Sequence, residues 1–322
     1  MRFLTALLYA VCFYSQVMSS ELTIPPEVRF TIEREGSDVP LVYYFEQPQK
    51  EDYPILMLCG GSNMKGDVVS VFRIYEEFKE RIHAFQEGYL AVEKWGVDGN
   101  SINEKEFWEH YSWSQRLKDH LQVIRHLQAN PPQGWNGKFV FIGGSEGGIL
   151  VTDLTMLCED TLATINWVGA ADESWDDEVW QFFEHWKNSS IWMRLYSALP
   201  KWLPFSLDFP QTREEFDEVL QEIRNNPTPE KWLGGLTYFY FADALQRQPV
   251  DYAKIRSPFL VVEGTEDSAL RSCDLFVQKA TAAGVPITYF RVEGMGHEIR
   301  ERPDVIEQSF LWLEEQLLNT VH

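Results

Sequence analysis

The chain has 322 residues, of which 44% are hydrophobic and 24% charged, a composition typical of globular proteins. Its formal net charge of −21 argues against nucleic acid as a partner and disfavours binding to an anionic membrane surface, because like charges repel. The length allows one large hydrophobic core or two smaller ones.

Residues 1–20 have the pattern of an export signal peptide. Arg2 makes the start of the chain positive, a short apolar run follows from Phe3 to Tyr14, and Ser19 or Ser20 supplies a small residue for cleavage. The apolar run is too short to span a bilayer comfortably. We therefore expect a secreted or periplasmic protein with no stable membrane span.

Apolar runs suited to strands alternate with amphipathic helical patterns over residues 21–170 and 251–322. The predicted strands are Val28 to Glu33, Leu41 to Phe45, Pro54 to Leu58, Tyr89 to Val92, Lys138 to Ile142, Ala163 to Val168, Phe259 to Val262 and Ile287 to Phe290. Helical spacing predicts one long helix from Phe107 to Leu127, a second from Ile149 to Leu157, and a last one from Ile306 to Leu317. Such alternation predicts an α/β fold with a mainly parallel, doubly wound sheet, and the first two strands form an antiparallel edge.

Residues 171–250 interrupt this alternation. The stretch has little strand character, and it contains six tryptophans: Trp175, Trp180, Trp186, Trp192, Trp202 and Trp232. Thr212 with Glu215 three residues later forms a capping box, which predicts the start of a helix. We expect an inserted helical cap, whose tryptophans either line an acyl or aromatic site or pack the cap onto the core.

The sequence Gly143-Gly144-Ser145-Glu146-Gly147 lies between a predicted strand and a predicted helix. A strand, a G-x-S-x-G turn and a helix make up a nucleophile elbow, in which small residues allow the backbone to turn sharply beneath an exposed serine. A serine hydroxyl is a poor nucleophile at neutral pH, so it needs an adjacent base, which in turn needs a carboxylate to orient it.

The loops after the two last strands supply these groups. Asp267 follows the strand that begins at Phe259, and His297 follows the strand that begins at Ile287. The carboxyl ends of parallel strands share one edge of the sheet, so both side chains can reach Ser145. Glu263 and Glu266 remain alternatives to Asp267, whereas none of the other six histidines follows a late strand.

With these three motifs in this order, the chain resembles the α/β-hydrolase superfamily. The resemblance implies that Ser145 is the nucleophile, Asp267 the acid and His297 the base. It also implies an oxyanion hole, formed by the backbone N–H of Glu146 and by one N–H from the loop after the third strand. In that loop Cys59-Gly60-Gly61 stands where the superfamily commonly has a His-Gly pair, so we assign the second donor to Gly61, with Ser62 as the alternative.

These residues predict a serine hydrolase that cleaves a carboxylic ester, or a thioester, of a small-molecule acyl substrate. Such chemistry needs no cofactor, and no Cys or His cluster has metal-ligand spacing; the sequence leaves the oligomeric state open. One alternative is a cap-bearing peptidase that binds a substrate amine through the acidic residues Asp172, Glu173, Asp176, Asp177 and Glu178. An alternative of another class is a non-catalytic binding module on the same fold.

Overall fold

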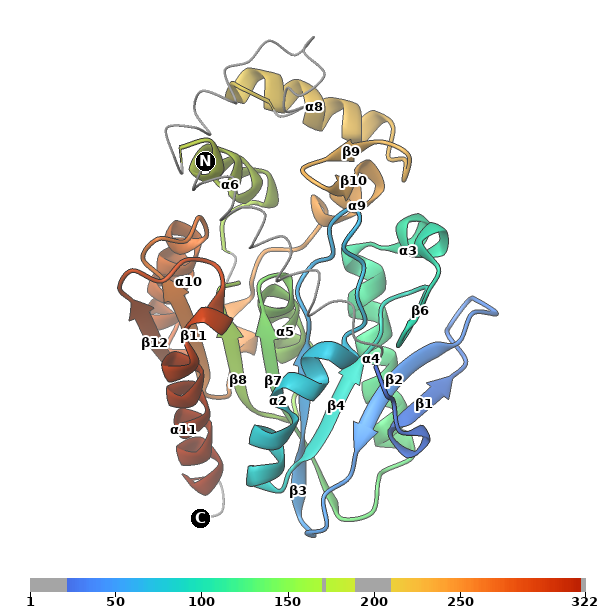
Figure 1. Ribbon diagram of the computed structural model, residues 1–322. Helices are drawn as coiled ribbons and strands as arrows, with labels where there is room; N and C mark the ends of the chain where they lie inside the picture. Colours follow the sequence, from blue (N-terminus) through green and yellow to red (C-terminus); the bar gives the residue numbers. More distant parts are fainter. Residues whose placement is uncertain (1–21, 170–171, 189–209, 320–322) are drawn as a thin grey trace, which may run out of the picture.

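The computed structural model describes residues 22–169, 172–188 and 210–319 (Figure 1). The predicted signal peptide, Trp192 and Trp202 therefore lie outside the described residues. An eight-stranded sheet forms the centre, with the order β1-β2-β4-β3-β7-β8-β11-β12. These strands are β1 (Arg29–Ile32), β2 (Leu41–Glu46), β3 (Tyr53–Cys59), β4 (Gly88–Val92), β7 (Trp135–Gly144), β8 (Thr161–Trp167), β11 (Phe259–Gly264) and β12 (Ile287–Val292).

The sheet is mainly parallel, as predicted. Only β2 runs against its neighbours: it pairs antiparallel with β1 and with β4, and every other pairing is parallel. The crossover from β3 leads to β4 on one side, while the crossover from β7 leads to β8 on the other. The chain order thus reverses between β3 and β7, and ligands of open α/β sheets bind at such a switch point.

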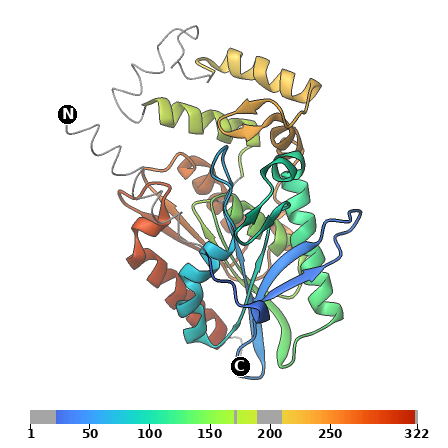
Figure 2. The same ribbon diagram turned by 45° about the vertical axis from the view of Figure 1, so that its right-hand side comes forward.

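Helices cover both faces of the sheet (Figures 1 and 2). The helices of the sheet region are α2 (Phe72–Phe85), α3 (Glu104–His110), α4 (Trp113–Ala129), α5 (Glu146–Leu157), α10 (Leu270–Ala282) and α11 (Pro303–Asn319). Along β3, Ile55 and Met57 face the cluster that includes α4 and α5, and Leu56 and Leu58 face the cluster that includes α2 and α11. Because both faces are buried, the strand is apolar throughout.

The single long helix predicted from Phe107 to Leu127 is wrong: the structure has two helices, α3 and α4. Tyr111 between them is extended, with φ −69° and ψ 106°, and the hydroxyl of Ser112 accepts a hydrogen bond of 3.3 Å from the N–H of Gln115. A serine followed three residues later by glutamine is a helix-start pattern, but the hydrophobic spacing runs across it. Two core helices, α2 and α10, have no counterpart among the predicted elements.

The elements between β8 and β11 lie above the carboxyl ends of the strands (Figure 1). They are the helices α6 (Trp175–Asn188), α8 (Arg213–Asn225) and α9 (Tyr238–Ala244) and the short ribbon of β9 (Trp232–Leu233) and β10 (Leu236–Thr237). The predicted capping box begins α8, since the Thr212 hydroxyl accepts a 3.2 Å hydrogen bond from the N–H of Glu215. Trp180 of α6 packs on Phe216 of α8, with ring centroids 5.6 Å apart.

Candidate active site

Ser145 lies at the turn from β7 into α5, with φ 55° and ψ −126°. A positive φ is uncommon for a residue with a side chain and places Ser145 in a strained turn. The flanking glycines are required sterically: a Cβ atom on Gly143 would lie 2.1 Å from the carbonyl oxygen of Gly147, and one on Gly147 would lie 2.1 Å from that of Cys59. The strand, the turn and the helix therefore pack too closely for any other residue at these two positions.

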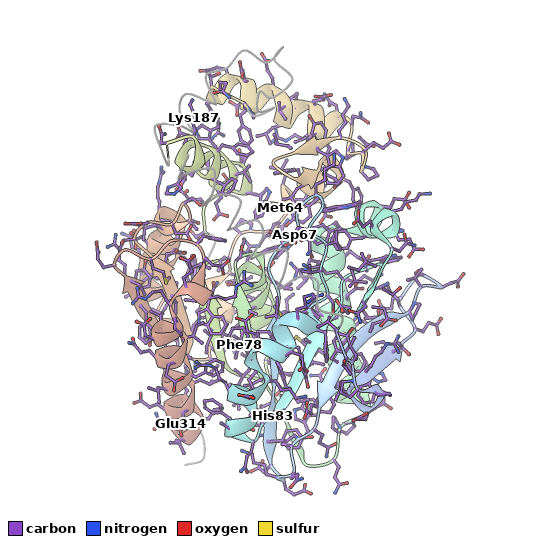
Figure 3. All side chains as sticks on the ribbon, viewed as in Figure 1. Met64, Asp67, Phe78, His83, Lys187 and Glu314 are labelled. Atoms are coloured by element: carbon purple, nitrogen blue, oxygen red, sulfur yellow. The ribbon has the colours of Figure 1, made fainter. Side chains whose placement is uncertain are left out.

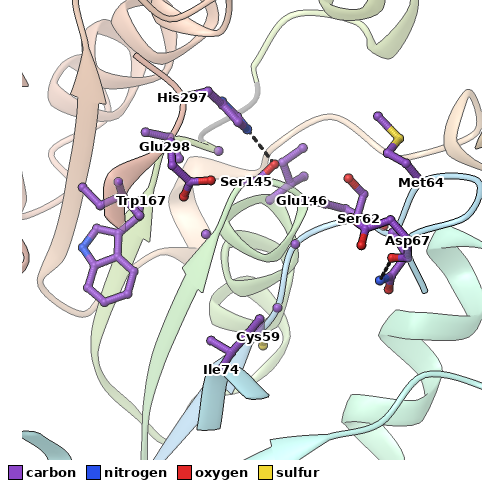
Figure 4. Close-up of a pocket in the computed structure, with 18 of the residues that line it drawn as sticks. Cys59, Ser62, Met64, Asp67, Ile74, Ser145, Glu146, Trp167, His297 and Glu298 are labelled. Atoms are coloured by element: carbon purple, nitrogen blue, oxygen red, sulfur yellow. Dashed lines mark hydrogen bonds between the residues drawn. The ribbon is translucent and has the colours of Figure 1, made fainter. Parts of the chain in front are cut away.

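The structure brings Ser145, His297 and Asp267 together from three separate loops. His297 Nε2 lies 2.9 Å from Ser145 Oγ, and His297 Nδ1 lies 2.7 Å from Asp267 Oδ2. Figure 4 shows the imidazole pointing down toward the serine at the start of α5. The second carboxylate oxygen of Asp267 accepts a 3.0 Å hydrogen bond from the N–H of Ala269, which fixes its orientation.

Asp267 and His297 each stabilise the charged form of the other. Burial raises the pKa of Asp267, but its hydrogen bond to His297 and the charge of the imidazolium lower that pKa by more, so it lies below its ordinary value. Partial burial lowers the pKa of His297, and the hydrogen bond and charge of Asp267 raise it by more, so it lies above its ordinary value.

The two alternative carboxylates do not reach the histidine. Glu266 is exposed, and Glu263 is fully buried beneath Asp267, where it accepts hydrogen bonds from the N–H of Gly264 at 2.8 Å and the thiol of Cys273 at 2.7 Å. Burial and the charge of Asp267 raise the pKa of Glu263, which keeps it uncharged near neutral pH. The geometry therefore selects Asp267 as the partner of the imidazole.

The loop after β3 passes directly beside the serine. A Cβ atom on Gly61 would lie 3.4 Å from Cβ and 3.9 Å from Oγ of Ser145. The backbone N–H groups of Gly61, Ser62 and Glu146 donate no hydrogen bond to any described residue, whereas the N–H of Asn63 donates to the Tyr111 hydroxyl at 3.3 Å. Gly61 thus lies beside Ser145, and the N–H groups predicted as oxyanion donors have no other hydrogen-bond partner among the described residues.

Cys59, at the start of this loop, is 1% exposed, and burial raises the pKa of its thiol to about 12. It therefore stays protonated and acts as a packed residue, not as a second nucleophile.

The side chain of Glu146 is buried below the elbow. It pairs with Arg116 at 2.8 Å and accepts hydrogen bonds from the hydroxyls of Tyr111 and, at 2.7 Å, Tyr240. Burial raises the pKa of Glu146, but the charges of Arg116 and Lys94 outweigh that effect, so the pKa lies below its ordinary value. The sequence offers no signal for this cluster, because its members come from separate elements.

Ser145 and His297 line a cavity of about 1220 Å³. Trp175 and Val179 of α6 line it from above, and Trp167 and Ile74 line its lower part, where Figure 4 shows them below the serine. Met64 and Asp67, which also line it, lie between the sheet and the overlying helices (Figure 3). A largely apolar cavity with a few converging polar groups is typical of small-molecule sites.

Four of the five acidic residues that follow β8 are paired with cations of the protein. Asp172 pairs with Lys279, Glu173 with Arg271, and Asp176 and Asp177 with Arg213. Glu178 has no such partner among the described residues and is the one of the five that lines the cavity, where it accepts a hydrogen bond from the Ser272 hydroxyl. Burial raises the pKa of Glu178 to about 8.

Within the described part of the chain, no three His, Cys, Asp or Glu side chains are grouped as metal ligands. None of the described helices is both long and apolar enough to cross a membrane.

Comparisons with known proteins show the fold. No protein-family model matches the chain, and no curated protein sequence matches it. Among solved structures, the chain is similar to Est1E from Butyrivibrio proteoclasticus, crystallised with ferulic acid, with a TM-score of 0.58, 16% identity and coverage of 90% of this chain and 99% of that one. It is also similar to a thermostable carboxyl esterase from Bacillus coagulans, with a TM-score of 0.60, 11% identity and coverage of 90% and 97%.

An acylaminoacyl peptidase from Pyrococcus horikoshii matches with a TM-score of 0.52 and 14% identity over 87% of this chain. The chain spans only about two fifths of the length of the acylaminoacyl peptidases it matches, 40% and 41%. Together with the topology of the sheet, these similarities show that the chain has the α/β-hydrolase fold.

Proposed function

We propose that the protein is an exported serine hydrolase that cleaves a carboxylic ester, or a thioester, through an acyl-enzyme. The observation that carries this proposal is the pair of hydrogen bonds that joins Ser145 to His297 at 2.9 Å and His297 to Asp267 at 2.7 Å. A hydroxyl, an imidazole and a carboxylate in this order form the arrangement that activates serine for acyl transfer. Export rests on the N-terminal sequence pattern alone, which indicates a secreted or periplasmic location.

The reaction follows from the geometry of these groups. His297 Nε2 accepts the proton of the Ser145 hydroxyl while Oγ attacks the substrate carbonyl, and Asp267 stabilises the imidazolium that forms. The N–H groups of Glu146 and of Gly61 or Ser62 donate to the oxyanion; losing one donor of this type raises the barrier by about 3 kcal/mol. His297 then protonates the leaving group, and water attacks the acyl-enzyme by the same sequence of proton transfers.

An ester suits the cavity better than a substrate with a free amine. Four of the five acidic residues that follow β8 are paired with cations of the protein, so of these five only Glu178 is left to bind an ammonium group in the cavity. With a pKa of about 8, Glu178 is mostly uncharged at pH 7 and attracts an ammonium weakly. The structural neighbours include both esterases and acylaminoacyl peptidases, so they do not decide between the two substrates.

The esterase and peptidase activities are distinguished by measuring hydrolysis of a short p-nitrophenyl ester and of an aminoacyl-p-nitroanilide. Each substrate is tested with the wild type and with Glu178→Gln. We expect turnover of the ester, and kcat/KM for it should change by no more than about twofold in Glu178→Gln, because a side chain that is already neutral is replaced by a neutral one of the same shape. Turnover of the anilide alone, with a KM that rises in Glu178→Gln, would establish the peptidase instead.

The activity should depend on pH through His297. The base must be neutral to accept a proton, and Asp267 raises the pKa of His297, so the proton is held to a higher pH than on an isolated imidazole. We therefore expect kcat/KM for the ester to rise with pH, with a midpoint above the ordinary value of about 6.5. Initial rates from pH 5 to 9 test this, and a flat profile would contradict the assignment of His297 as the base.

A further inference from the structure

Two side chains donate hydrogen bonds to backbone carbonyls of the loop after β3, and one of them, Lys94, also lines the cavity. Arg116 Nη2 donates to the carbonyl oxygen of Gly60 at 2.7 Å, and Lys94 Nζ donates to that of Gly61 at 2.6 Å. The side chain of Arg116 is 4% exposed, and Lys94 is partly buried. The two carbonyls that accept these bonds belong to successive peptide units.

These contacts fix the direction of the N–H groups in the same peptide units. None of the described peptide bonds is cis, and in a planar trans peptide the C=O and the N–H point in opposite directions. Arg116 therefore directs the N–H of Gly61 away from itself, and Lys94 does the same for the N–H of Ser62. Gly61 and Ser62 are the two candidates for the second oxyanion donor, so one of the two contacts orients that donor whichever residue supplies it.

Glu146 links this loop to the elbow. Its carboxylate pairs with Nη1 of Arg116 at 2.8 Å, while its own backbone N–H is the other oxyanion donor. Arg116 thus bridges the two segments that carry the two donors, Gly60-Gly61-Ser62 after β3 and Glu146 after β7. The hydroxyls of Tyr111 and Tyr240 complete the hydrogen bonds of the carboxylate.

Lys94 makes two contacts with the loop after β3. Its amine donates to the carbonyl of Gly61 and to the side-chain oxygen of Asn63. Burial and the charge of Arg116 lower the pKa of Lys94 to about 7. A neutral amine still has two N–H donors for these two acceptors, so the contact persists on either side of that pKa.

We propose that Arg116 and Lys94 are positioning residues that preorganise the oxyanion hole, with Glu146 holding Arg116 in place. The inference rests on the proposed acyl transfer and adds residues to the same site. Neither side chain touches the reacting atoms; both act through the peptide units they orient. Donors that are already directed at the developing charge need no reorganisation during the reaction, which is the source of their effect on the rate.

The first test is Lys94→Met, which removes the donor and keeps an unbranched side chain. We expect kcat for the p-nitrophenyl ester to fall by about 10- to 100-fold, as displaced reacting groups typically cause, with KM changed by no more than about twofold. Affinity for an alkyl boronic acid, which forms a tetrahedral adduct on the serine, should fall by the same factor as kcat. A merely structural lysine would not produce this proportionality.

The second test removes the bridge between loop and elbow. Arg116→Met alone leaves a buried carboxylate without its partner, so the double variant Arg116→Met/Glu146→Gln removes both charges. The matched control is Arg34→Met/Asp119→Asn, a pair equally buried, with side chains 1% and 3% exposed, that does not line the cavity. We expect the first double variant to lose about 10- to 100-fold in kcat and in boronic acid affinity, and the control to keep both.

The outcomes separate this inference from the proposed function. Wild type that turns over no ester would overturn the proposed function. An active wild type together with Lys94→Met and Arg116→Met/Glu146→Gln proteins that keep kcat and boronic acid affinity would overturn the positioning role alone. Loss of the near-ultraviolet circular dichroism of Lys94→Met would also overturn the positioning role, because the lysine would then be needed for folding.

Discussion

Ser145→Ala is expected to lower kcat for the p-nitrophenyl ester by on the order of 10⁶-fold, the loss that removal of the nucleophile causes in the serine protease subtilisin. The reason is that in the proposed mechanism Oγ forms the bond to the acyl group, and no second hydroxyl is hydrogen-bonded to the imidazole among the described residues. Initial rates measure the loss, and a fluorophosphonate probe, which reacts covalently with an activated serine, should no longer label the protein.

Ser174→Ala is the control for this experiment. Ser174 is exposed, and its hydroxyl donates to Asp177 at 2.8 Å with no histidine beside it. The control should hydrolyse the ester and take up the probe as the wild type does. Labelling that survives in folded Ser145→Ala would contradict the assignment of the nucleophile. A folded wild type that neither labels nor turns over ester would favour the binding module.

Asp267→Asn is expected to lower kcat by about 10⁴-fold, because an amide that donates to Nδ1 holds the imidazole in the wrong tautomer. Asp267→Asn should also change how the remaining activity depends on pH. The carboxylate raises the pKa of His297 in the wild type, so its removal should move the midpoint of the residual activity to lower pH. Rates from pH 5 to 9 on both proteins measure the two effects together.

Glu263→Gln is the matched control, since it makes the same type of change at the carboxylate directly beneath Asp267. Glu263 is uncharged near neutral pH, because burial and the charge of Asp267 raise its pKa. Replacing it with a neutral amide should cost less than about tenfold in kcat. A loss in Glu263→Gln as large as that in Asp267→Asn would make Glu263 the residue that orients the imidazole.

The predicted strands are all present because each carries its evidence in its own residues. The buried parallel strand β3 is a continuous apolar run, and β11 is apolar from Phe259 to Val262, which the sequence shows directly. The helices were harder to predict, since apolar spacing continues from Phe107 across Tyr111 into α4 although the chain turns at Ser112. The Ser112 cap marks the break locally, and a tertiary contact accompanies it: the Tyr111 hydroxyl donates to Glu146, a residue 35 positions later.

Part of the candidate site could likewise be predicted from the sequence, and part could not. The elbow around Ser145 could be predicted because its glycines and serine stand in one short motif between a strand and a helix. The steric demand on Gly143 is local, from the carbonyl oxygen of Gly147, whereas the demand on Gly147 comes from Cys59 of β3. The sequence assigned the acid to Asp267 but left Glu263 and Glu266 as alternatives, because all three stand within five residues at the end of one strand. Only burial and the contact with His297 in the folded chain distinguish them.

Local pattern was sufficient for the alternation of strands and helices, the sharp turn that carries the serine, and the loops that bear the acid and the base, because backbone sterics and hydrophobic periodicity act over a few residues. Only the folded chain decides that Arg116, Lys94 and Glu146 meet beneath that turn, and that four of the five acids after β8 have cations of their own. Charges pair in a protein interior by distance in space, and the sheet order, not the order along the chain, sets those distances.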